Sequence, residues 1–76
     1  MKTTAFNHEL IRIRREQAGW SREDLIVELA KLGVRTHSNT IANWESGETS
    51  PDADALPKLA QALRTSVSDF YNGNRS

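Results

Sequence analysis

The side chains best suited to specific recognition chemistry lie in residues 36–47, which read THSNTIANWESG. Asn39 and Asn43 carry carboxamides, which both donate and accept hydrogen bonds and can pair with the edge of an adenine in a major groove. At about 100° per residue, they share the outward side of a helix, whereas Ile41 and Trp44 share the opposite side. The pattern fits a reading surface, and it fits an ordinary solvated helix face about equally well.

The sequence offers little support for catalysis or for metal binding. It contains no Cys, and no Ser, His and acidic residue form a recognisable nucleophile–base motif. His8 and His37 lie far apart, without the spacing of metal ligands, and are expected at the surface. The acidic stretch GETSPDAD lacks the closing Glu of a calcium loop. We therefore expect no enzyme activity, no cofactor and no metal site.

Length and composition predict one small soluble domain. The chain has 76 residues, 26% of them charged and 37% hydrophobic, which suits a single core over about residues 6–72 with a frayed tail at 73–76. No apolar run approaches the roughly 20 residues of a membrane span, and the N-terminus lacks a secretory signal, so a cytoplasmic location is expected. Ten basic and ten acidic residues cancel, which argues against attraction of the whole molecule to nucleic acid.

Hydrophobic periodicity is helical throughout, which predicts an all-α domain. Five helices are expected: about 7–18 with Asn7 as N-cap, from Ser21 to Gly33, about 38–46 ended by Gly47, from near Asp54 through Leu63, and from Ser66 through Tyr71. The predicted core consists of Phe6, Ile11, Leu25, Leu29, Val34, Ile41, Trp44, Leu56, Leu59, Leu63, Val67 and Phe70. Phe70 and Tyr71 fit the core or a dimer surface equally well.

Three segments in order carry a resemblance to a known family: RREQAGWSREDL, TIANWESG and LPKLAQAL. With their surroundings, residues 7–73, they resemble the helix-turn-helix domain of the phage-repressor and Cro family, the XRE-like regulators. The resemblance implies a compact five-helix, lambda-repressor-like fold whose second and third helices form the helix-turn-helix. It also implies a sequence-specific transcriptional regulator, prokaryotic or phage, that binds a palindromic DNA operator as a homodimer.

The resemblance also implies roles for individual residues. Three positions of the third helix match those that touch base edges: Ser38, Asn39 and Asn43. Two positions match DNA-backbone contacts of the family: Thr40, and Arg22, which stands where the family often has a phosphate-binding Gln. Arg35 and His37 are further candidates for backbone contacts, because they supply positive charge around the helix-turn-helix. The positive patch is thin, so we expect weak binding by a monomer.

Arg15 and Glu45 match an internal ion pair that joins the first and third helices in this family. The pair would explain why a Glu directly follows the packed Trp44, because a partly buried charge needs a partner. Arg15 lies on the side of the first helix that is expected to supply it.

The sequence departs from the family pattern in three places. The connection from Gly33 to Ile41 is about two residues longer than the commonest spacing, which changes the helix-turn-helix docking. The loop after the third helix carries Glu48 and Asp52 where the family often has Lys or Arg, and Arg64 replaces a frequent Gly. The acidic loop and zero net charge support an alternative, a protein-interaction module on the same fold, such as an antitoxin or anti-regulator partner.

Overall fold

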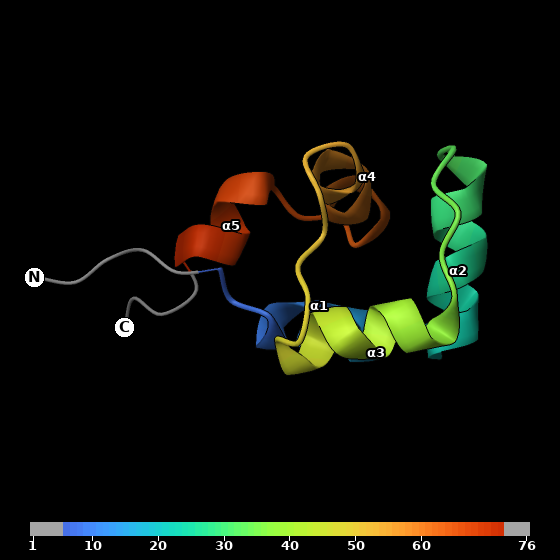
Figure 1. Ribbon diagram of the computed structural model, residues 1–76, viewed down its shortest axis with the longest axis horizontal. Helices are drawn as coiled ribbons and strands as arrows, with labels where there is room; N and C mark the ends of the chain where they lie inside the picture. Colours follow the sequence, from blue (N-terminus) through green and yellow to red (C-terminus); the bar gives the residue numbers. More distant parts are fainter. Residues whose placement is uncertain (1–5, 73–76) are drawn as a thin grey trace, which may run out of the picture.

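The computed structural model describes residues 6–72 and contains five helices there (Figure 1). They are α1 Glu9–Gln17, α2 Arg22–Lys31, α3 Ser38–Ser46, α4 Ala55–Ala62 and α5 Val67–Asn72. No strand occurs within this described range, so the all-α prediction is confirmed. The predicted frayed tail at 73–76 lies outside the described residues. Between residues 6 and 72, every helix is too short or too polar to cross a membrane.

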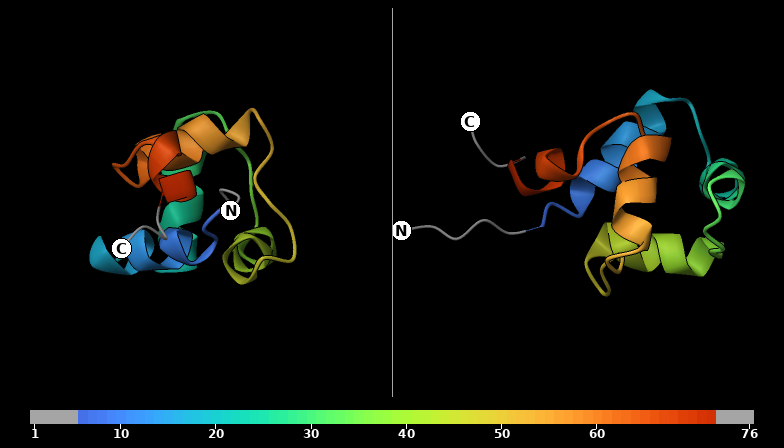
Figure 2. Two further views of the ribbon diagram at one scale, coloured as in Figure 1. Left: turned by 90° about the vertical axis from the view of Figure 1, so that its left-hand side faces the viewer. Right: turned by 90° about the horizontal axis from the view of Figure 1, so that it is seen from above.

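The arrangement leaves one side of α3 open. α3 packs against α1 and α2, while α4 packs against α2 and α5. Both views in Figure 2 place α3 at the margin of the bundle, with one side toward the other helices. A helix in this position must be apolar on its inner side and is free to carry polar groups on its outer side.

The core is built from the inner sides of all five helices. The buried apolar residues are Ile11, Leu25, Leu29, Ile41, Trp44, Ala55, Leu59, Ala60, Ala62, Leu63 and Phe70. Four predicted core residues, Phe6, Val34, Leu56 and Val67, are only half-buried at its margin. Three alanines of α4, Ala55, Ala60 and Ala62, are buried in the core although they were not predicted there.

Local signals placed most helix ends correctly. Ser21 caps α2 in a capping box: its hydroxyl accepts the N–H of Asp24 (3.1 Å), and the Asp24 carboxylate accepts the N–H of Ser21 (2.9 Å). Gly47 ends α3 at φ 91°, a conformation that strongly favours glycine. The predicted bounds of α3 are therefore confirmed.

The predicted N-cap Asn7 is wrong, whereas the fourth helix begins near Asp54 as predicted but is capped by another side chain. α1 begins at Glu9, and Asn7 instead donates its N–H to the carbonyl of Phe70 at 2.6 Å. At α4 the Asp52 carboxylate accepts the N–H of Ala55 at 2.8 Å, and Asp54 makes no capping bond. The backbone of Asp54 is already helical, whereas a capping side chain needs extended backbone to reach the first turn.

The longer connection between α2 and α3 is extended. Residues 34–37 run alongside α2 before α3 begins (Figure 1), and His37 has φ −124° and ψ 161°. The N–H of Val34 donates to the carbonyl of Leu29 (2.9 Å), which closes the end of α2. This geometry leaves Arg35 and His37 exposed.

Candidate nucleic-acid interface

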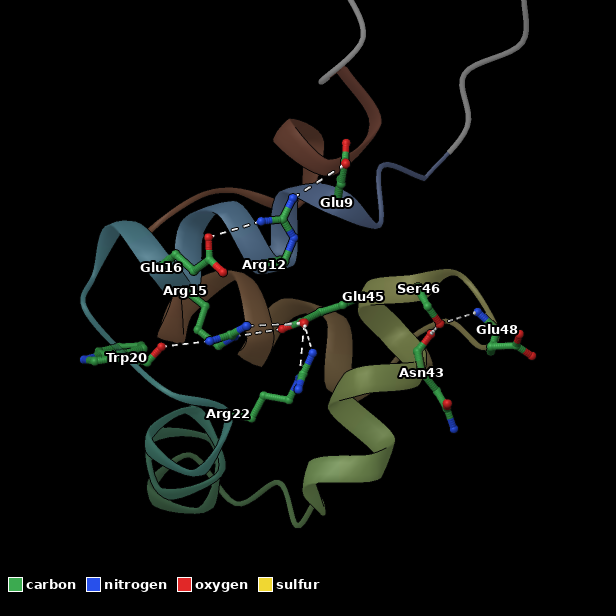
Figure 3. A network of polar contacts seen from close by, with 10 residues as sticks. All are labelled: Glu9, Arg12, Arg15, Glu16, Trp20, Arg22, Asn43, Glu45, Ser46 and Glu48. Atoms are coloured by element: carbon green, nitrogen blue, oxygen red, sulfur yellow. Dashed lines mark hydrogen bonds and ion pairs between the residues drawn. The ribbon is translucent and has the colours of Figure 1, made fainter.

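The two sides of α3 differ sharply. Ile41, Trp44 and Glu45 are buried, and they hold the helix to the body of the domain. The outward side carries Ser38, Asn39 and Ser46, which are exposed, and Ala42 and Asn43, which are half-buried. Figure 3 shows the Asn43 carboxamide turned away from the buried cluster around Glu45. The outward side is thus short, polar and uncharged.

A groove of about 450 Å³ separates the N-terminal end of α2 from α3. We call it the α2–α3 groove; it is lined by Arg15, Ser21, Arg22, Glu23, Ser38, Asn39 and Ala42. It brings three of the residues predicted to contact DNA to one place: Arg22, Ser38 and Asn39. The positive end of the α2 dipole points into the same region, which favours an anionic group there.

Behind this groove, Glu45 is held by two arginines from different helices (Figure 3). Arg15 on α1 donates from Nε to Oε2 at 2.8 Å and from Nη2 to Oε1 at 3.4 Å. Arg22 on α2 donates from Nε and Nη2 to the same Oε1, at 3.2 Å and 3.1 Å. The structure therefore brings Arg15 and Glu45 together, and it adds Arg22, which was considered only as a phosphate contact.

This cluster ties three helices together through charged groups. Arg15 also donates from Nη1 to the carbonyl of Trp20 at 2.9 Å, so each of its three nitrogens has a partner. A buried carboxylate is costly unless paired and hydrogen-bonded, and here it has two cationic partners. Two guanidinium groups against one carboxylate give the cluster one net positive charge, and the carboxylate of Glu23 lies at the same groove.

The other flank of α3 has a different character. A second groove of about 450 Å³ runs there between the 33–36 segment, α3 and the loop before α4. Thr40 and Arg35 line it together with two carboxylates, those of Asp52 and Asp54. The predicted backbone contacts are therefore not gathered: Arg22 lies on one flank of α3, Thr40 and Arg35 lie on the other, and exposed His37 directly precedes the helix.

His8 also differs from its prediction as a surface residue. It is half-buried, and its Nδ1 lies 2.8 Å from the carbonyl oxygen of Trp44 near the end of α3. Its ring meets Phe6 edge-on, with 4.8 Å between ring centroids. A Cβ on Gly47 would lie 3.5 Å from this ring. Nothing local in the sequence signals this contact, because it joins positions 36 residues apart.

Comparison with known proteins places the chain in a family. Residues 11–70 match the model of the Helix-turn-helix family, and the protein belongs to it. Its structure is similar to the solution structure of the DNA-binding domain of the P22 C2 repressor, with 29% sequence identity, a TM-score of 0.76 and coverage of 99% of this chain and 92% of that one. Among curated proteins no significant match is found. The repressor-like fold expected from the sequence is confirmed.

Proposed function

We propose that the protein is a sequence-specific DNA-binding transcriptional regulator that reads the major groove with α3. The observation that carries this proposal is the division of α3. Its inner side is anchored by buried residues, and its outer side presents short hydrogen-bonding groups on Ser38, Asn39 and Asn43. A helix that needed only solubility would more often carry Lys and Glu there. Carboxamides can pair with adenine, and small neighbours permit close approach to a groove.

The charge distribution supports modest affinity for each copy. The formal net charge is zero, so long-range attraction to DNA is weak. Arg22, at the edge of the α2–α3 groove, is the best-placed phosphate contact, and Arg35 and His37 are further candidates. Because each neutralised phosphate contributes about −0.9 to the slope of log K against log salt concentration, we expect a shallow slope for a monomer.

Binding as a homodimer would compensate for this weakness. A helix of nine residues covers a short stretch of groove, and two copies on a palindromic operator would double both base and phosphate contacts. The two copies of α3 would then enter successive major grooves, about 34–36 Å apart. In a prokaryotic or phage setting such a regulator works in the cytoplasm, by occupying a promoter rather than by chemistry.

Selection from a random duplex library at two salt concentrations tests this function. We expect enrichment of a pseudo-palindrome with half-sites about one helical turn apart, together with a shift to the dimer in the complex. Failure to retain any duplex at low salt and high protein concentration would contradict the proposal.

Replacing Asn39 by Ala sharpens the test. If Asn39 pairs with a base, the variant should lose about 1–3 kcal/mol at one operator position and relax preference there, because the bidentate contact is gone. Binding to a panel of single-base operator variants measures this. Gln17→Ala, an exposed substitution at the end of α1, is the matched control and should change nothing. Equal weakening of every duplex by Asn39→Ala would show that Asn39 does not read sequence.

One observation favours a second candidate function, a protein-interaction module such as an antitoxin or anti-regulator partner. Asp52 and Asp54 lie beside α3 in the second groove, and carboxylates there would repel a phosphate backbone that came close. A protein that binds no duplex and instead captures a cationic partner through this flank would support this alternative.

A further inference from the structure

We propose that Glu45 is a positioning residue for DNA binding, which holds the guanidinium group of Arg22 in advance at the place where it meets a phosphate. This inference rests on the proposed DNA-binding function and deepens it. Glu45 itself touches no DNA in this proposal; it acts through Arg22.

The orientation of the Arg22 side chain is the first support. Its Nε and Nη2 both donate to Oε1 of Glu45, at 3.2 Å and 3.1 Å, so one edge of the planar guanidinium is fixed (Figure 3). The remaining Nη1 is directed away from that edge by the geometry of the group. The side chain of Glu45 is 4% exposed and that of Arg22 is 42% exposed. Arg22 thus has a buried anchor and an accessible outer end.

The anchor is rigid, which is the second support. The other oxygen of Glu45, Oε2, accepts from Nε of Arg15 at 2.8 Å, and Arg15 also donates to the carbonyl of Trp20 at 2.9 Å. Arg15 is 9% exposed. Glu45 therefore cannot turn to follow Arg22 without breaking a buried ion pair. Buried Arg15 thus fixes Glu45, and Glu45 in turn fixes the partly exposed side chain of Arg22.

The surroundings of Arg22 are the third support. The α2–α3 groove lies between its guanidinium, Ser21 at the start of α2, and Ser38 and Asn39 on α3. A phosphate oxygen beside Arg22 would meet a cation and hydroxyl groups close to the residues proposed to read bases, and the carboxylate of Glu23 lines the same groove. An arginine that is already ordered loses less conformational freedom when it binds, and its contact is stronger for that reason.

Charge alone predicts the opposite effect for Glu45. A carboxylate behind the groove lowers the local positive charge, so its removal would strengthen attraction to DNA if charge were its whole role. If Glu45 positions Arg22, its removal weakens binding even though the net charge rises. Whether removal of Glu45 strengthens or weakens DNA binding therefore distinguishes a purely electrostatic role from a positioning role.

The first experiment needs no variant and no DNA. In a ¹H–¹⁵N spectrum of the wild-type protein near neutral pH, the Nε–H signal of Arg22 should be protected from exchange with water, because Glu45 accepts it. Exposed Arg35 serves as the reference within the same spectrum. Exchange of the Arg22 signal as rapid as that of Arg35 would overturn the inference.

The second experiment is a double-mutant cycle on the selected duplex, with Glu45→Gln and Arg22→Lys alone and combined. Each single variant should bind about tenfold more weakly, since Lys keeps the charge but not the fork that Glu45 holds. In the Arg22→Lys background, Glu45→Gln should have little further effect. Glu23→Gln is the matched control, because Glu23 lines the same groove and carries the same charge; it should bind equally well or more tightly.

Two outcomes of the cycle would overturn the inference. Binding of Glu45→Gln equal to that of Glu23→Gln would mean that only charge matters. Equal weakening by Glu45→Gln in both backgrounds would mean that it acts through the fold. Circular dichroism must show each variant folded at the assay temperature, and if Glu45→Gln is not, the exchange measurement decides. A wild-type protein that binds no duplex contradicts the proposed function instead, and leaves the exchange result standing.

Discussion

At the scale of single residues, the carboxylate of Glu45 on the inner side of α3 joins three helices through its contacts with Arg15 and Arg22. The family resemblance implied that Glu45 pairs with Arg15, and the packing of the neighbouring Trp44 explained why this carboxylate needs a cationic partner. The same reasoning assigned Arg22 to a phosphate without noticing that Arg22 also reaches Glu45 at 3.1 Å. The reach of a long flexible side chain depends on how α2 and α3 cross, which spacing along the chain does not specify.

Arg64 is the non-glycine residue with positive φ (59°) within the described range. It ends α4 as Gly19 and Gly33 end α1 and α2: Arg64 donates its N–H to Gln61, and the following Thr65 donates to Ala60, the Schellman pattern. Arg64→Gly should therefore stabilise the domain by about 0.5–1 kcal/mol, since glycine adopts this conformation without strain.

Thermal unfolding checks this prediction, with an expected rise in Tm of about 2–8 °C for a domain of this size. Arg64→Ala is the control, because it removes the side chain and keeps the strained backbone. If Arg64→Ala raised Tm as much as Arg64→Gly, the benefit would come from losing the arginine side chain and not from the backbone.

At the scale of helices, side chains from neighbouring elements complete several helix ends. His8 contacts the carbonyl of Trp44 near the end of α3, and Lys58 on α4 donates from Nζ to the carbonyl of Leu32 at the end of α2 (3.3 Å). Terminal carbonyls have no partner within their own helix, so these contacts both satisfy them and fix how the helices pack. They were not predicted, because each partner comes from a distant part of the chain.

The start of α5 gives a prediction about pH. The Thr65 hydroxyl and the Ser66 N–H both donate to the carboxylate of Asp69, and these bonds lower its pKa from the ordinary value of 3.8. Because the pKa is lowered in the folded state, the ionised carboxylate stabilises the fold at pH values above its ordinary pKa. This contribution is lost as the pH falls through the lowered pKa of the folded state.

The variant Asp69→Asn should accordingly be less stable than the wild type near neutral pH, and the two should converge in Tm below pH 3.8. Thermal unfolding of both proteins over the acid range measures this. Ser68→Ala, a neighbouring exposed substitution without a titrating group, is the control. A Tm difference that is constant with pH would show that the charge of Asp69 plays no part.

At the scale of the whole molecule, the two flanks of α3 differ in charge. At the α2–α3 groove two arginines, Arg15 and Arg22, balance the carboxylates of Glu23 and Glu45. The second groove has one arginine, Arg35, against the two carboxylates of Asp52 and Asp54. Because the net charge of the protein is zero, the difference in charge between the two flanks, and not the total charge, must orient the domain toward DNA. It favours close approach at the Arg22 flank and repulsion at the acidic one.

Asp54→Asn should therefore tighten binding to every duplex by about 2–5-fold at low salt, because it removes a repelling charge near α3. The gain should shrink near 0.1 M salt and above, where the Debye length is about 10 Å. Asp54 suits the test because its side chain makes no capping bond, unlike that of Asp52.

Titration of a fluorescent duplex at several salt concentrations measures the effect. Glu16→Gln, which removes the same charge from an exposed position of α1, is the control and should change binding less. Equal gains from both variants would show that the total charge matters and its position does not.

The amino-acid sequence by itself determined the helices, most of their ends and the outward side of α3. These features follow from short-range rules: periodic apolar residues, Ser21 as a cap, and glycine at positions of positive φ. Beyond the Arg15–Glu45 pair that the family resemblance implied, the tertiary structure alone decided which polar groups meet. Arg22 joins Arg15 on Glu45, His8 reaches α3, and Asp52 rather than Asp54 caps α4, because such contacts depend on the crossing of helices and on the direction of the backbone entering them.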